Sequence, residues 1–124
     1  MREFGDLEAA IMDRLWSSEQ PLTVREMLDE LATDRRLAYT TVMTVMDNLY
    51  RKGWLTRELA GRAYLYRPVS SRQEYSAELM RQALAGSGDE VATLLRFVDH
   101  MTDEEATAVR DAIRGRLRKG KRET

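Results

Sequence analysis

In the first half of the chain, hydrophobic residues recur every three or four positions in three separate stretches. This spacing places them along one side of an α-helix and predicts helices over residues 6–17, 24–33 and 39–54. Thr23 lies three residues before a glutamate, which is the spacing of a capping box at the start of the second helix. Gly53 is a helix terminator at the end of the third.

After Gly53 the pattern changes from helical to extended. Residues 54–58 and 63–67 are rich in aromatic and aliphatic side chains, which favours two β-strands. Residues 59–62, with Gly61, are the predicted turn between them. Three helices followed by a hairpin over about 70 residues is the element order of a winged helix-turn-helix domain. The hairpin is then the wing, and Arg62 lies near its tip.

The remaining residues predict three more helices, with capping-box spacing at Ser71, Ser87 and Thr102. Three short helices cannot bury their apolar stripes against one another, so we expect a second copy of the chain to cover them. The predicted architecture is mainly α with a small β-hairpin: a winged-helix DNA-binding domain over residues 1–70 and a helical dimerisation region over residues 71–124. The predicted dimer-interface residues are Tyr75, Leu79, Val91, Leu94, Leu95, Phe97, Val98, Met101, Val109, Ile113 and Leu117.

The predicted third helix has two chemically different faces. An apolar stripe runs from Val42 to Leu49 and faces the core. The opposite side carries hydroxyl, amide and guanidinium groups from Thr40, Thr44, Asn48 and Arg51. Such groups form hydrogen bonds with base edges and phosphates in a DNA major groove. An ordinary amphipathic surface helix has the same periodicity, so this segment alone leaves both interpretations open.

The charge of the chain is unevenly distributed. Its 124 residues, 33% charged and 43% hydrophobic, are typical of one soluble domain with an appended element, and the net charge is only -1. Residues 35–67, however, contain seven basic and two acidic side chains, a local charge of +5, whereas the residues before them are net acidic. A basic patch on a near-neutral protein favours a specific DNA-binding protein over one that coats DNA non-specifically.

The composition also excludes several kinds of chemistry. The chain has no cysteine and one histidine, His100, so thiolate catalysis, disulfides and histidine-rich metal sites are excluded. Carboxylates such as Glu78 lie three or four residues from basic residues, as on a solvated helix face. We therefore expect no enzyme activity, cofactor or metal. Neither a stretch of 18 apolar residues nor a signal peptide is present, and a cytoplasmic location is expected.

Several segments in a fixed order resemble the penicillinase repressor (BlaI/MecI) family of bacterial transcriptional regulators. They are Gly5 to Glu8, Ile11-Met12, Leu15-Trp16, Thr23-Val24-Arg25, Ala38 to Leu49, Lys52-Gly53 and Leu94 to Val98. The resemblance covers nearly the whole chain. It implies a homodimeric winged-helix repressor that occupies a palindromic operator and blocks genes for β-lactam resistance, or for cell-wall or respiratory stress.

The predicted DNA contacts combine the third helix with the wing and the start of the second helix. They are Thr23, Arg25, Tyr39, Thr40, Thr41, Thr44, Asn48, Arg51, Lys52 and Arg62. Thr40 and Thr41 lie near a helix N-terminus, where backbone amides also attract phosphate. Asp47 is the exception on this face, because DNA repels a free carboxylate. It either accepts from a cytosine amino group or pairs with Arg51 four residues later.

The resemblance leaves the mode of release open. In staphylococcal members a membrane-bound sensor metalloprotease cuts an Asn-Phe bond in the dimerisation helices. Here Arg96 precedes Phe97, and Asn48 is the only asparagine. The cut therefore falls at Arg96-Phe97 or elsewhere, or another signal releases the repressor. The cysteine-rich tail of the copper-responsive branch is missing, which excludes thiolate metal sensing for this chain.

Two other functions fit a winged helix. One is a protein-interaction module that docks its third helix and wing on a partner protein without binding DNA. The other is a repressor gated by a small molecule, although no ligand pocket is evident from the sequence. The basic residues at 114–122 complement a helix dipole or contact DNA non-specifically.

Overall fold

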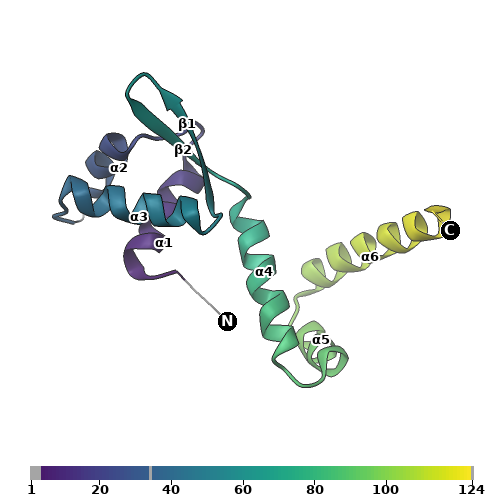
Figure 1. The fold of residues 1–124 in the computed structure, drawn as a ribbon. Coiled ribbons are helices and arrows are strands. Elements are labelled where there is room, and N and C mark those ends of the chain that lie inside the picture. Colours follow the sequence, from purple (N-terminus) through teal and green to yellow (C-terminus); the bar gives the residue numbers. More distant parts are fainter. Residues whose placement is uncertain (1–3, 34, 124) are drawn as a thin grey trace. The chain divides into compact units, whose positions relative to one another are not determined.

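The computed structural model describes residues 4–33 and 35–123, and its elements follow the order expected from the sequence (Figure 1). The elements are α1 (Asp6–Ser17), α2 (Val24–Leu31), α3 (Tyr39–Arg51), β1 (Leu55–Ala60), β2 (Ala63–Pro68), α4 (Arg72–Ala85), α5 (Glu90–Asp99) and α6 (Asp103–Glu123). The chain forms two compact units, one ending at Met80 and one beginning at Arg81. The predicted functional division at residue 70 stays a prediction.

The core of the N-terminal unit lies between α1, α2, α3 and the base of the hairpin. Val42, Met46 and Leu49 on the inner side of α3 are 0% exposed, so the predicted apolar stripe does face the core. Leu55 and Tyr66 bring the two strands into the same cluster. The other buried members are Ile11, Met12, Leu15, Leu22, Val24, Met27 and Leu31. Burial of one side fixes which side of α3 faces solvent.

Local hydrogen bonds set the ends of α2 and α3. The capping box of α2 is confirmed: the Thr23 N–H donates to Glu26 Oε1 at 2.9 Å, and the Glu26 N–H donates to Thr23 Oγ1 at 3.1 Å. At the end of α3, Gly53 adopts a φ of 89°. The Trp54 N–H then donates to the Leu49 carbonyl at 3.0 Å, and the Gly53 N–H to that of Tyr50 at 3.1 Å. Helix α3 therefore ends at Arg51, three residues earlier than predicted.

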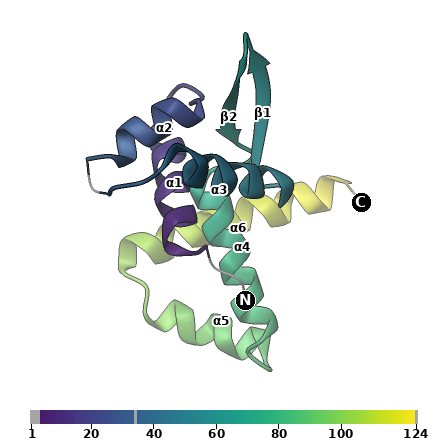
Figure 2. The same ribbon diagram turned by 60° about the vertical axis from the view of Figure 1, so that its left-hand side comes forward.

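The wing is an antiparallel hairpin that projects away from the three helices in both views (Figures 1 and 2). Its pairing runs from Leu55 opposite Pro68 to Ala60 opposite Ala63. The predicted four-residue turn is wrong, because only Gly61 and Arg62 separate the strands. Gly61 has a φ of 66°, as a type II′ hairpin turn requires at its first central position. A two-residue turn places Arg62 at the tip itself.

An aromatic cluster packs the start of α4 against the rest of the N-terminal unit. Tyr75 stacks on Phe4 with ring centroids 4.5 Å apart and meets Trp54 edge-on at 5.2 Å. Trp16 lies beside both Phe4 and Tyr75, and its Nε1 donates to the Ser70 carbonyl at 2.9 Å. Tyr75 was expected at a dimer interface, but the structure places it within its own chain, and we leave it out of the interface proposed below.

In the C-terminal unit, α5 and α6 are capped differently. The capping box of Thr102 with Glu105 is confirmed by reciprocal bonds of 2.9 and 3.1 Å. The predicted cap at Ser87 is wrong, because the Asp89 side chain accepts from the Ala92 N–H and caps α5. Ser87 instead donates from its hydroxyl to the Leu84 carbonyl. Aspartate at the N-cap serves α5 as well as serine does, so the sequence contained two equivalent starts.

Candidate nucleic-acid interface

The outward side of α3 presents the predicted polar groups to solvent. Thr40, Thr41, Thr44, Asn48 and Arg51 are all exposed, whereas Val42, Met46 and Leu49 on the inner side are buried. The N-cap residue, Ala38, makes no side-chain capping bond. The first amides of α3 therefore have no side-chain acceptor, and such amides attract phosphate. This side of α3 offers short donors and acceptors on a rigid element.

A shallow groove of about 240 Å³ separates α3 from the wing and the start of α2. It brings together residues that are far apart in the sequence: Thr23, Arg25, Tyr39, Met43, Arg62 and Tyr64 are among its lining. The Arg25 guanidinium lies over the Tyr39 ring, 5.0 Å from its centroid. The Thr23 oxygen already accepts a capping bond, so its hydroxyl proton is what remains to donate. Two arginines thus flank an aromatic groove beside the outward side of α3.

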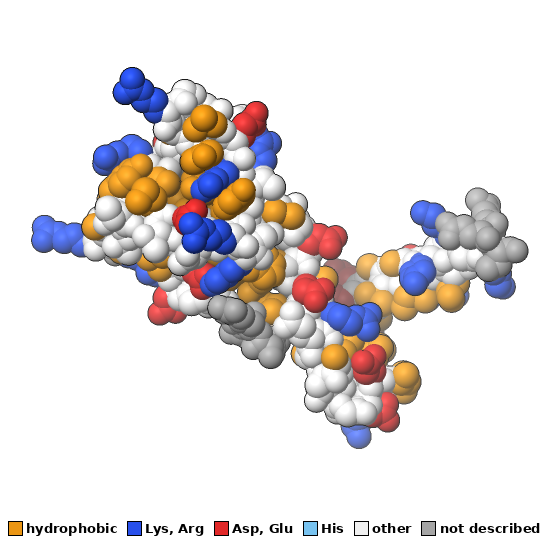
Figure 3. Space-filling model, viewed as in Figure 1, with side chains coloured by type: hydrophobic (Ala, Val, Ile, Leu, Met, Phe, Trp, Pro, Cys, Tyr) orange, Lys and Arg blue, Asp and Glu red, His pale blue; other side chains and the backbone are white. Residues whose placement is uncertain are grey.

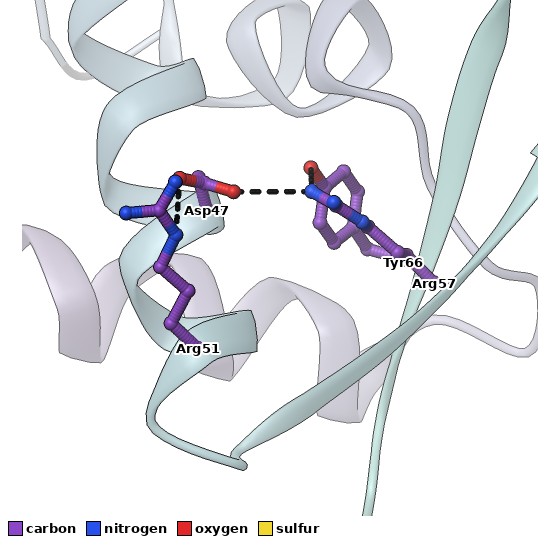
Figure 4. A network of polar contacts seen from close by, with 4 residues as sticks. All are labelled: Asp47, Arg51, Arg57 and Tyr66. Atoms are coloured by element: carbon purple, nitrogen blue, oxygen red, sulfur yellow. Dashed lines mark hydrogen bonds and ion pairs between the residues drawn. The ribbon is translucent and has the colours of Figure 1, made fainter.

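Asp47 is neutralised within the protein. Its Oδ2 lies 3.1 Å from Arg51 Nε, and its Oδ1 lies 3.1 Å from an Arg57 amine nitrogen. Figure 4 shows the carboxylate between the two guanidinium groups. Of the two predicted roles, the pairing with Arg51 is the one observed, together with a partner on β1 that was not predicted. The carboxylate is therefore not a free negative charge on this face.

Arg57 connects α3 to both strands of the wing. Its guanidinium lies 4.0 Å from the ring centroid of Tyr50 and 4.1 Å from that of Tyr64. It also donates to the Tyr66 hydroxyl at 3.5 Å. This hydrogen bond with Tyr66 raises the pKa of Arg57 above its ordinary value. The group is thus cationic at every physiological pH.

Lys52 lies apart from the other predicted DNA contacts. It is the C-cap residue of α3, and its Nζ lies 2.9 Å from Glu8 Oε2 of α1. This ion pair directs the ammonium towards α1. The structure therefore brings nine of the ten predicted contacts to α3, the groove and the wing tip, and places Lys52 at the far end of α3.

The C-terminal unit leaves its apolar side chains uncovered. Leu95 is 63% exposed and Leu117 is 63% exposed, values typical of a surface and not of a core. Figure 3 shows hydrophobic side chains in a row along α6. The exposed predicted interface residues are Val91, Leu94, Leu95, Phe97, Val98, Val109, Ile113 and Leu117, whereas Leu79 and Met101 are half-buried. An apolar surface of this extent on one short unit is unusual for a monomer.

Four residues near the interface were missed by the sequence reasoning: Met43, Tyr50, Arg57 and Tyr64. Tyr50 and Met43 are seven positions apart on α3, so helical periodicity alone could have grouped them on one side. Arg57 and Tyr64 come from the two strands, and a register error of one residue would have sent them to the other face. The observed pairing of Arg57 with Tyr66 is what shows on which face of the hairpin Arg57 and Tyr64 lie.

Within residues 4–33 and 35–123, no helix combines the length and the apolar character that crossing a bilayer requires. No group of three histidine, aspartate or glutamate side chains in that part of the chain is placed to hold a metal ion.

Three helices, a hairpin and a backbone bridge between Leu22 and Tyr66 define the winged helix-turn-helix class of protein. The family model of the penicillinase repressor matches residues 4–115. The transcriptional regulator BlaI of Mycobacterium tuberculosis is 44% identical over 116 residues, which cover 91% of this chain and 84% of that protein. The chain therefore belongs to the penicillinase repressor family, whose members are regulators of transcription and not enzymes.

Solved structures agree on the fold. The monomeric form of Bacillus licheniformis BlaI, solved in complex with the blaP half-operator, gives a TM-score of 0.50 at 24% identity and covers 60% of this chain and 89% of its own. MepR, a transcription regulator of the Staphylococcus aureus multidrug efflux pump MepA, gives 0.52 at 14% identity, covering 94% of this chain and 80% of its own. The predicted fold class, mainly helical with a winged helix, is confirmed.

Proposed function

We propose that the chain is a transcriptional repressor that binds operator DNA through α3 and its wing. The observation that carries this proposal is the outward side of α3, where Thr40, Thr44 and Asn48 are exposed beside a basic groove. Membership of a repressor family and the 44% identity to a transcriptional regulator support it. Such a protein acts on DNA in the cytoplasm.

In this proposal α3 enters the major groove. Thr44 and Asn48 face the base edges, and Thr40 and Thr41 lie near the amides of the helix start, which bind phosphate. The groove between α3 and the wing receives the sugar-phosphate backbone, because Arg25 and Arg62 supply charge at its sides. Arg51 leaves Asp47 for a phosphate at little cost, since the Arg51 side chain is 74% exposed and solvent screens its charge.

We further propose that two copies associate through the apolar surface of α5 and α6. Covering this surface removes side chains such as Leu95 and Ile113 from water, which favours association. A two-fold dimer requires an inverted repeat in the operator. The family resemblance suggests that such an operator controls genes for β-lactam resistance or envelope stress.

Release by proteolysis stays a prediction. The Arg96-Phe97 bond lies inside α5, and the Phe97 side chain is exposed. A protease that cleaves an extended segment requires local opening of this helix, so cleavage follows the population of the open form. A membrane sensor metalloprotease is the partner that the family resemblance suggests, and another releasing signal is the alternative.

A protein-interaction module is the second candidate function. Tyr39, Met43, Tyr50 and Tyr64 are exposed on or beside α3, and aromatic and methionine side chains are enriched at protein interfaces. A salt titration of DNA binding separates the two. Neutralising several phosphates makes the logarithm of the binding constant fall linearly with that of the salt concentration. Weak DNA binding that does not depend on salt concentration in this way would favour the protein-interaction module.

Asn48→Ala and Arg62→Ala are expected to weaken DNA binding in different ways. Asn48→Ala should lower discrimination at particular base pairs by about 1–3 kcal/mol, because it removes a group that reads base edges. Arg62→Ala should weaken binding to all sequences about equally and reduce the salt slope by about 1. Affinities measured on operator and mixed-sequence DNA at several salt concentrations check both. Operator binding that matches the parent in both variants would reject the docking.

A further inference from the structure

The outer part of the wing has no cover of its own. Residues 58–63 are all exposed, and beyond the bridge between Leu22 and Tyr66 the two strands pair only with each other, an arrangement that is marginally stable in water. The base of the hairpin is anchored by buried Leu55 and Tyr66, but the direction of the tip depends on contacts further out. A side chain that reaches from the strands to α3 can hold the wing in place.

Arg57 is placed to do this. It lies opposite Tyr66 in the hairpin, and Leu59 lies opposite Tyr64, so Arg57, Tyr64 and Tyr66 share the face that meets α3. From that face its guanidinium reaches Asp47 at 3.1 Å and the Tyr50 ring at 4.0 Å, both on α3. One side chain of β1 thereby contacts two residues of α3 and two of β2.

The chemistry of these contacts is specific to arginine. The side chains of Arg57 and Asp47 are 23% and 28% exposed, so the pair is partly shielded from water. A planar guanidinium packs against aromatic rings while its edge donates to a carboxylate and a hydroxyl. The ammonium of lysine keeps the charge but offers neither the flat surface nor the fixed fork of donors.

The same carboxylate ties this contact to the DNA-reading face. Asp47 binds Arg57 through one oxygen and Arg51 through the other (Figure 4). The next residue along α3 is Asn48. The contact between the wing and α3 therefore lies next to the side chains that are proposed to face the bases.

We propose that Arg57 is a positioning residue that clamps the wing to α3 and so fixes Arg62 at the wing tip relative to the base-reading side chains. The inference rests on the proposed DNA-binding function but assigns Arg57 no contact with DNA. A fixed spacing between two contact regions favours one DNA geometry, so the clamp contributes to operator discrimination and not to general affinity.

Arg57→Lys tests the clamp because it conserves charge. Affinity for a DNA fragment from upstream of the chain's own gene is expected to fall about 10-fold, comparable to one mismatched base pair. Affinity for mixed-sequence DNA of equal length, and its salt slope, are expected to stay within about twofold of the parent, since no phosphate contact is lost. Equal losses on both DNAs would mean that Arg57 contacts the backbone, and would overturn the proposal.

Arg67→Lys is the matched control. Arg67 is an exposed arginine on the same hairpin, but it pairs with Thr56 on the opposite face. This variant is expected to behave like the parent on both DNAs. A drop in discrimination as large as that of Arg57→Lys would show that any change in the wing has this effect, and would also contradict the clamp.

A second measurement needs no DNA. Amide hydrogen exchange of β1 and β2 is expected to be about 10-fold faster in Arg57→Lys than in Arg67→Lys, because the clamp opposes local opening of the wing. Unchanged exchange would overturn the clamp even if the protein binds operator. If exchange is faster in Arg57→Lys but the unmodified chain prefers no DNA sequence, the contact between the wing and α3 is supported and the proposed function is rejected.

Discussion

Replacing Leu95 by aspartate is expected to abolish the proposed dimer and to lower affinity for the full operator by about 10²–10⁴-fold, the gain that linking two binding modules typically provides. Leu95 is 63% exposed in the single chain, so the variant folds. In a dimer its carboxylate would be buried without a partner, which is strongly unfavourable. Sedimentation measures the oligomeric state, and titrations with full-operator and half-operator DNA measure the two affinities.

The half-operator provides the internal comparison, since its affinity depends on one winged unit and should not change. Ala108→Asp adds the same charge to α6 away from the stripe of Val109, Ile113 and Leu117, and is expected to remain dimeric. An unchanged dimer in Leu95→Asp would place the interface elsewhere.

Two methionines of α3 provide the second large effect. Met46 is 0% exposed and Met43 is 41% exposed, although both lie on the same helix. Met46→Ala should lower the free energy of unfolding by about 2–5 kcal/mol, because it leaves a cavity in the core. Met43→Ala should cost less than about 1 kcal/mol. Urea denaturation measures both values.

The opposite outcome for this pair would be informative. Equal costs for Met43→Ala and Met46→Ala would mean that α3 is rotated relative to the core. The outward side that is proposed to read DNA would then be assigned incorrectly.

Much of the fold could be predicted because its signals are local. Apolar residues at helical spacing, the Thr23 capping box and Gly53 each act within a few residues, and the structure has helices at the expected places. The outward position of Asn48 followed from the same periodicity. The predicted helix start was wrong where two nearby residues could both cap the helix, as with Ser87 and Asp89 at the start of α5.

The rest depends on contacts between residues distant in the sequence. The stack of Tyr75 on Phe4 joins residues that no periodicity relates, so Tyr75 looked like part of an uncovered stripe. The ion pair of Arg57 with Asp47 depends on the hairpin register and on the direction of the wing, and neither can be read from local sequence. Charge counting placed both in a basic region without indicating that they neutralise each other.

The two winged units of the proposed dimer are expected to read an inverted repeat through α3. A hydroxyl-radical footprint of the protein on DNA upstream of its own gene tests this most directly. Two protected segments related by two-fold symmetry are predicted, with centres spaced by about 10 base pairs or a multiple of that. A single unrepeated segment, or uniform protection along the fragment, would contradict the account.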